Sequence, residues 1–93
     1  MYDIAYRHEA AREIEALRAF DRVRILAAIG AHLSGTPGRM GGRKKWIALE
    51  EGDFICQLRV GDFRVFYDVD DDQGLVIIRH VRRKGRRTTG AVL

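Results

Sequence analysis

The sequence has few of the residues and segments that several protein classes require. It contains one cysteine and one proline in 93 residues, so no disulfide can form within the chain, as is usual in a reducing cytoplasm. No apolar run is longer than a few residues, so we expect no membrane span. No apolar segment follows Met1, so we expect no secretory signal. These absences together predict a cytoplasmic protein.

The composition predicts one small globular domain. Hydrophobic residues make up 46% of the chain and charged residues 32%, which is the balance of a folded protein rather than a disordered one. A chain of 93 residues is too short for two hydrophobic cores. We therefore expect a single domain over residues 1–93, with a basic C-terminal tail over residues 84–93.

Acidic residues are missing from two stretches that together hold ten of the 17 basic residues. These basic residues are Arg39, Arg43, Lys44, Lys45, Arg79, Arg82, Arg83, Lys84, Arg86 and Arg87. Residues 50–78, between the two stretches, carry eight acidic residues against two arginines. Basic clusters of this kind are typical of proteins that bind polyanions, although a solvated basic tail would give the second stretch by itself.

Hydrophobic periodicity predicts an α+β fold. Residues 2–7 alternate as a strand, and residues 10–18 and 22–33 show helical spacing, with Asp21 as the expected N-cap of the second helix. Residues 46–49, 54–60, 63–70 and 75–81 then read as four strands separated by turn signals. We expect an N-terminal strand, a helical hairpin and a four-stranded antiparallel meander, with both helices on one face of the sheet.

The hairpin over residues 54–70 can be aligned from sequence. If Gly61 and Asp62 form a two-residue turn, Arg59 lies directly opposite Arg64, on the face away from the core. Like charges in opposite positions destabilise a sheet, so the pair indicates an anionic ligand, unless both side chains simply extend into water. Cys56 falls on the core face, where we expect it to be a small buried hydrophobic residue.

The faces on which three further side chains lie depend on the alignment of two more strand pairs. Pairing Leu49 with Phe54 places Trp46 on the face of the arginines, where an indole can stack on a base; otherwise Trp46 covers the edge of the core. Pairing Asp70 with Leu75 places His80 on the core face and Val81 beside Arg64. His80 is then a structural residue, with proton transfer as the alternative.

The sequence predicts no metal site and no cofactor. The three histidines lack the spacing of metal ligands, and consecutive aspartates at positions 70–72 are typical of a solvated hairpin turn. The glycine-rich segment over residues 38–45 lacks the end of a Walker loop. We therefore interpret its basic residues as contacts for phosphate groups rather than as a nucleotide site.

Residues 58–70, L-R-V-G-D-F-R-V-F-Y-D-V-D, resemble the L-R-x-G-x-[YF]-R-[VL]-x-Y centre of the RelE/ParE toxin superfamily. The resemblance extends over nearly the whole chain through the order of its predicted elements. It implies the toxin of a bacterial type II toxin–antitoxin pair. RelE-like members cut messenger RNA in the ribosomal A site, whereas ParE-like members poison DNA gyrase.

The resemblance also implies candidate site residues. Arg64 lies at the position of the family's phosphate-stabilising arginine, and Lys84 matches the basic position in the C-terminal motif of the ribonucleases. Arg83 is its neighbour, and His80 is a candidate for proton transfer. The ribonuclease tyrosine has no counterpart, because Gly90 stands at its position. The candidate nucleic-acid-binding residues are Arg43, Lys44, Lys45, Trp46, Arg59, Arg79, Arg82 and Arg86.

Three functions remain open from the sequence: a ribosome-dependent, metal-free messenger RNA endoribonuclease, a gyrase inhibitor without catalytic residues, and a non-toxic member that only binds its antitoxin. All three imply a cognate antitoxin, and the first adds RNA on the ribosome as a partner. We expect no membrane partner and an oligomeric state set by the antitoxin complex.

Overall fold

The structure is a computed structural model that describes residues 1–84. The elements are β1 (Asp3–Tyr6), α1 (His8–Glu15), α2 (Ala19–Leu33), β2 (Lys44–Ala48), the 3-10 turn η1 (Glu50–Gly52), β3 (Phe54–Val60), β4 (Phe63–Asp70) and β5 (Leu75–Arg83). No helix within this part of the chain is both long and apolar enough to cross a membrane.

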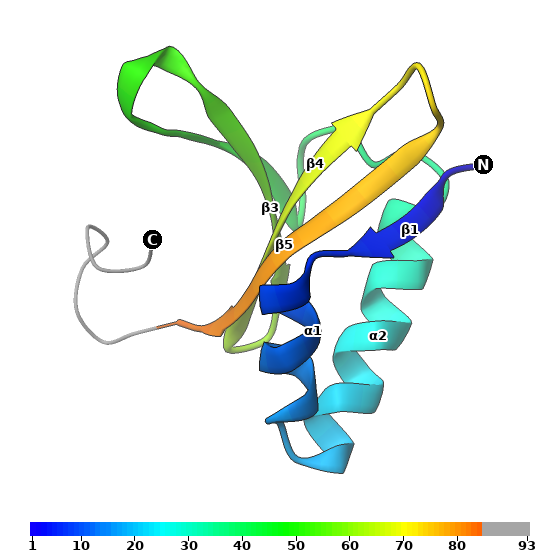
Figure 1. Ribbon diagram of the computed structural model, residues 1–93, viewed down its shortest axis with the longest axis vertical. Helices are drawn as coiled ribbons and strands as arrows, with labels where there is room; N and C mark the ends of the chain where they lie inside the picture. Colours follow the sequence, from blue (N-terminus) through cyan, green and yellow to red (C-terminus); the bar gives the residue numbers. More distant parts are fainter. Residues whose placement is uncertain (85–93) are drawn as a thin grey trace.

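The five strands form one mixed sheet in the order β1-β5-β4-β3-β2. Strand β1 runs parallel to β5, and the other pairs are antiparallel. Figure 1 shows α1 and α2 on one side of the sheet, while the β2–β3 hairpin, in green, extends away from both helices. The predicted α+β fold is confirmed. The structure adds that β1 joins the four-strand meander as an edge strand.

The start of the second helix differs from the prediction. Helix α2 begins at Ala19, so its N-cap is Arg18, which makes no side-chain capping bond. Asp21 instead lies in the first turn, where a carboxylate interacts favourably with the positive end of the helix dipole. The N-cap prediction was wrong because an aspartate stabilises both positions and the sequence pattern does not separate them.

The β3–β4 hairpin has the predicted alignment, with Arg59 opposite Arg64 and Leu58 opposite Val65. Its turn is tight: Gly61 takes a φ of +57°, and a Cβ there would lie 3.1 Å from the Arg24 guanidinium. The positive φ favours glycine at this position, and the Arg24 guanidinium packs close against it.

The predicted faces of the last strand were wrong from His80 onward. Asp70 pairs with Leu75 as expected, but the alignment of β4 with β5 shifts between Phe66 and Tyr67. Because such a β-bulge adds one residue to one strand, the residues after it change faces. His80 lies opposite Phe66 on the face of the arginines, and Val81 is buried in the core.

The predicted face of Trp46 was also wrong. Ala48, not Leu49, pairs with Phe54, so Trp46 lies opposite Cys56. A shift of one residue reverses every side chain of a strand. Leu49 belongs to the connection instead, where its N–H donates to the Asp53 carbonyl at 2.7 Å across the 3-10 turn η1. Trp46 therefore shares the face of Cys56, on the helix side of the sheet.

The hydrophobic core lies between the helices and the sheet. Its members are Ala10, Ile14, Ile25, Ile29, Leu33, Cys56, Leu58, Val60, Phe63, Val65, Tyr67, Val76, Ile78 and Val81. Burial raises the pKa of the Cys56 thiol to about 11, so Cys56 is a neutral hydrophobic residue at physiological pH, as predicted. The opposite face is partly apolar too, because Ile55 and Phe66 are buried there.

The hydroxyl of Tyr67 connects the core to the loop after α2. It donates a hydrogen bond of 2.8 Å to the carbonyl oxygen of Pro37, and both residues are fully buried. Burial raises the pKa of the Tyr67 phenol well above its usual value, so the group remains a neutral donor. The bond fixes the start of the glycine-rich segment against the sheet.

Replacing Tyr67 by Phe should lower the free energy of unfolding by about 1–2 kcal/mol, because the Pro37 carbonyl would be buried without a donor. Urea denaturation measures this change. Tyr6→Phe, at a more exposed tyrosine, is the control and should alter stability by less than about 0.5 kcal/mol. Equal effects of the two substitutions would contradict the assignment.

Candidate nucleic-acid interface

A row of arginines crosses the sheet on the face away from the helices. Arg59 pairs with Arg64, and Arg64 pairs with Arg82 on the next strand. The backbone N–H of Arg59 donates a 2.8 Å bond to the carbonyl of Arg43, which extends the row toward β2. Four guanidinium groups thus start from neighbouring backbone positions on four adjacent segments.

The row borders a cleft with a volume of about 280 Å³. Its lining residues are Gly42, Arg43, Lys45, Gln57, Arg59, Arg64 and Lys84. Five of these seven carry a positive charge and none carries a negative charge. Concentrated charge of one sign in a concave site raises the local concentration of the opposite ion. The cleft therefore has the electrostatics of a phosphate-binding site.

The β3–β4 turn positions Arg64 within the cleft. Nη1 of Arg64 donates to the carbonyl oxygens of Gly61 and Phe63, both at 2.9 Å. The backbone N–H of Lys84 donates to the Asp62 carbonyl at 2.6 Å, so the end of β5 is attached to the same turn. Arg64 and Lys84, both predicted site residues, are brought together here although they lie 20 positions apart in the sequence.

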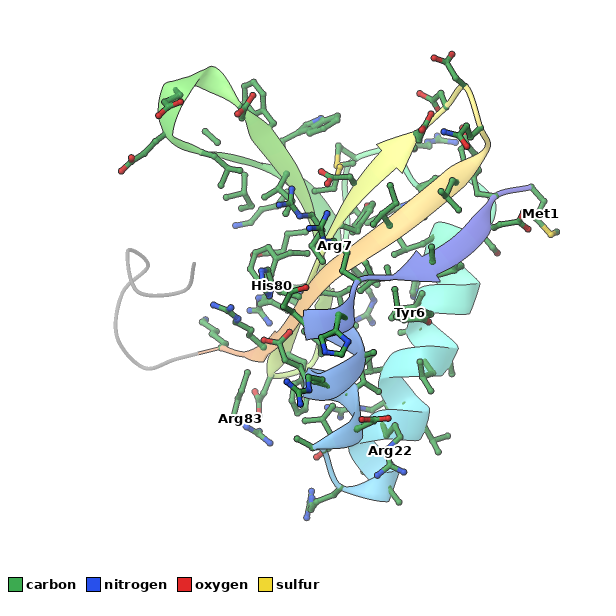
Figure 2. All side chains as sticks on the ribbon, in the orientation of Figure 1. Met1, Tyr6, Arg7, Arg22, His80 and Arg83 are labelled. Atoms are coloured by element: carbon green, nitrogen blue, oxygen red, sulfur yellow. The ribbon has the colours of Figure 1, made fainter. Side chains whose placement is uncertain are left out.

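His80 lies beside the row and contacts α1 (Figure 2). Its Nδ1 is 3.5 Å from Oε1 of Glu13 and 3.3 Å from Nη2 of Arg82. The Glu13 carboxylate also accepts a hydrogen bond of 2.9 Å from the backbone N–H of Val81 and one of 3.3 Å from Nε of Arg82. Since β1 pairs with β5 only as far as Ile78, the Glu13 carboxylate provides an acceptor for a backbone N–H of β5 that β1 does not reach.

Arg83 does not join the cleft, contrary to the prediction. Its guanidinium lies 4.5 Å from the centre of the Phe63 ring and 3.9 Å from Asp21, on the helix face of the sheet. Asp21 is only 4% exposed and is also paired with Arg18 and Arg24, at 3.3 and 3.8 Å. The alternation of side chains along β5 separates Arg83 from both of its neighbours.

Lys44 also departs from its predicted role. Its Nζ donates to the carbonyl of His32 at 3.2 Å and to that of Thr36 at 2.7 Å, at the end of α2. Burial, with the nearby charge of Arg39, lowers the pKa of this lysine. A cation at the C-terminus of a helix compensates free carbonyl groups, so Lys44 stabilises the fold while Lys45 lines the cleft.

The remaining predicted contacts are scattered. Arg79 is paired with Asp68 at 3.1 Å, and Trp46 lies on the other face from the arginine row. Arg86 lies outside the described residues. Within residues 1–84, no group of three or more His, Cys, Asp or Glu side chains is placed to hold a metal ion.

Sequence reasoning did not single out Glu13 or Gln57 as neighbours of the site, although it assigned the segment that contains Gly42 to phosphate contacts. Gln57 lies two residues before Arg59 and lines the same cleft, so its place on the face of the arginines was a usable signal. Glu13 carried no such signal, because it looks like any solvent-facing residue of an amphipathic helix and lies 68 positions from Val81. Only the packing of α1 against the end of β5 reveals it.

The fold is that of the RelE-type toxins. The chain superposes on RelE in an archaeal RelE–RelB complex from Pyrococcus horikoshii with a TM-score of 0.73, 20% identity and coverage of 92% of this chain and 98% of that one. The comparison with the Mycobacterium tuberculosis RelBE2 complex gives a TM-score of 0.72 at 23% identity, with coverage of 88% of this chain and 96% of that one. The comparison with the isolated Escherichia coli RelE toxin gives a TM-score of 0.65 at 17% identity, with coverage of 94% of this chain and 88% of that one.

The family is shown by sequence. The family model described as the ParE toxin of the type II toxin–antitoxin system parDE matches residues 4–87. The chain therefore belongs to this family, within the RelE/ParE superfamily that residues 58–70 indicated, and is the toxin component of a type II toxin–antitoxin system. No match was found among curated proteins.

The two adjacent lysines provide a direct test of the β2 alignment. Lys44→Ala should lower the free energy of unfolding by about 1–2 kcal/mol, because the end of α2 loses two hydrogen bonds from a charged donor. Lys45→Ala should change it by less than about 0.5 kcal/mol. Thermal or urea unfolding of the two variants measures both values, and the reverse order would show that the alignment is shifted by one residue.

Proposed function

We propose that this toxin acts on RNA, cutting messenger RNA on the ribosome without a metal ion. The observation that carries the proposal is the cleft on the arginine row, which combines Arg64 at the family's phosphate position with Lys84 at its C-terminal basic position. The relatives named above are solved as RelE toxins, and their fold supports the same arrangement. Antitoxin chains present in two of those structures support a cognate antitoxin as the partner of this chain.

The chemistry would use the 2′-hydroxyl of the substrate as the nucleophile. It attacks the adjacent phosphorus, the 5′-oxygen of the next nucleotide leaves, and a cyclic phosphate remains. The protein must neutralise the additional charge that develops on the phosphate. Arg64 and Arg59 supply guanidinium groups at neighbouring positions, and guanidinium matches the geometry of phosphate oxygens.

Two protons must move in this reaction, one from the 2′-hydroxyl and one to the 5′-oxygen. Lys84 lines the cleft and matches the basic position in the family's C-terminal motif, so it is one candidate for proton transfer. His80 lies next to the arginine row, with Glu13 and Arg82 at its Nδ1. Because Nδ1 makes these contacts, we assign the contact with the substrate to Nε2. We assign proton transfer to these two residues, with phosphate neutralisation as the larger contribution.

Arg64→Ala should reduce cleavage of messenger RNA about 100-fold or more, the usual effect of removing a group that stabilises a developing oxyanion. Primer extension on messenger in programmed ribosomes measures the rate. Arg64→Lys should retain part of the activity, because it keeps the charge and loses the planar donor fork. Arg12→Ala, at an exposed residue of α1, is the control. Wild-type cleavage by Arg64→Ala would refute the role of this arginine.

Binding of a single-stranded RNA oligonucleotide should weaken steeply with salt. Each phosphate neutralised contributes about −0.7 to the slope of log K against log salt for single strands. Arg59→Ala should reduce the steepness of this slope by about that amount, while Arg12→Ala should leave it unchanged. Fluorescence anisotropy measures the binding constant at salt concentrations between about 50 and 200 mM. Identical slopes for the two variants would exclude the cleft as the RNA site.

A gyrase inhibitor is the second candidate, and one observation favours it. None of the seven residues that line the cleft is a histidine, aspartate or glutamate, and a protein that only blocks an enzyme needs no proton-transfer group. The lesion in cells separates the two functions. Induced expression should give cut messenger and intact DNA if RNA is the target, and broken DNA with intact messenger if gyrase is the target.

A further inference from the structure

The two ends of the sheet have opposite charge. The β3–β4 turn lies at the end that carries the arginine row. The opposite end carries η1 and the β4–β5 turn, and its acidic residues are Glu50, Glu51, Asp53, Asp70, Asp71 and Asp72. In Figure 1 the green η1 turn and the yellow β4–β5 turn lie at the same end of the molecule. The acidic segment noted in the sequence thus lies on two turns at one end of the sheet, which diverge from each other in Figure 1 and lie away from the β3–β4 turn.

Two exposed aromatic rings lie at this acidic end, on the helix side of the sheet. Trp46 and Phe54 are 54% and 60% exposed, and their ring centroids are 6.2 Å apart with the planes at 75°. Their strands extend away from α1 and α2 (Figure 1), so the helices leave this part of the sheet open. Exposed apolar surface bordered by polar residues can mark an interaction site.

The rings border a groove with a volume of about 320 Å³. Its lining residues are Gly38, Trp46, Phe54, Cys56, Asp68, Val69 and Asp71. The groove therefore offers two aromatic surfaces and two carboxylates and contains no basic residue in its lining. The arginine cleft has the opposite composition and shares no lining residue with the groove.

The charge on the groove is only partly compensated. Asp68 is paired with Arg79 at 3.1 Å. Asp71 accepts a hydrogen bond from the phenol of Tyr2, and this bond raises the pKa of Tyr2, so the donor is neutral at physiological pH. The negative charge of Asp71 thus remains available to an incoming cation. A phosphate or a nucleic acid would be repelled at the same place.

We propose that this groove, formed by Trp46, Phe54, Asp68 and Asp71, binds an arginine or lysine side chain on a basic segment of a protein partner. A cation over an aromatic ring is attracted by the negative face of the ring, and nearby carboxylates add an opposite charge. This site is separate from the arginine cleft, and it does not depend on whether the toxin acts on RNA or on gyrase. It gives Trp46 a role as a contact for a cationic peptide rather than as a base-stacking platform.

The only tryptophan of the chain is Trp46, so its fluorescence reports directly on this groove. The probes are the peptides acetyl-Gly-Arg-Gly-Arg-Gly-amide and acetyl-Gly-Glu-Gly-Glu-Gly-amide and a single-stranded RNA oligonucleotide, each titrated into the purified chain. The arginine peptide should change the emission of Trp46 in a saturable manner. The glutamate peptide should not, and the RNA should bind without changing it.

Phe54→Ala should weaken the binding of the arginine peptide between about two- and fivefold, which is the effect of losing one exposed cation–π contact. Asp71→Asn should also weaken it, with a smaller dependence on salt. Arg64→Ala, in the opposite cleft, should leave peptide binding unchanged while reducing RNA binding, so a failure of the groove is distinguishable from a failure of the proposed function. If Phe54→Ala does not fold, as judged by circular dichroism, Asp71→Asn decides the result.

Three results would overturn the proposal. The first is equal binding of the two peptides. The second is full binding of the arginine peptide by the folded groove variants. The third is a change in Trp46 emission caused by the RNA or by raising the protein concentration alone, which would assign the aromatic pair to a nucleic acid or to a second copy of the chain.

Discussion

The β-bulge between β4 and β5 is the feature on which the candidate site depends. Without the shift at Phe66 and Tyr67, strict alternation along β5 would direct Arg82 toward the core and Val81 toward solvent. With it, Val81 completes the core and Arg82 extends the row begun by Arg59 and Arg64. A bulge leaves one residue unpaired and turns the residues after it to the opposite face. Here it allows the core on one face and the basic row on the other to continue along β5.

The β3–β4 turn is the second constraint, because it is held from both faces of the sheet. Arg64 bonds to the turn carbonyls on the cleft side, while Arg24 lies against Gly61 on the helix side. Asp21 balances Arg24 and Arg83 there. The arginines around the turn thus divide between two tasks. Arg24 and Arg83 on the helix face are paired with Asp21 of α2, whereas Arg59 and Arg64 on the other face line the cleft.

This division explains how a small chain carries so many basic residues without losing its fold. Repulsion between neighbouring cations is reduced where each has a carboxylate or carbonyl partner, as for Arg83 and Lys44. It remains within the cleft, where an anion would relieve it. Six acidic residues lie in or beside η1 and the β4–β5 turn, at the end of the sheet away from the cleft, so the two ends of the sheet differ in charge.

The sequence by itself determined the class of the fold, the β3–β4 alignment and the position of Arg64, because alternation and a tight glycine turn are local signals. Only the tertiary structure decided the faces of Trp46, His80 and Arg83. A bulge and a 3-10 turn change the alignment by single residues, which the alternation of residue types along the chain does not reveal. The bulge is accompanied by the burial of Val81 in the core between the sheet and the helices. The same holds for Lys44 and Glu13, whose partners at the end of α2 and along β5 are brought near only by the completed fold.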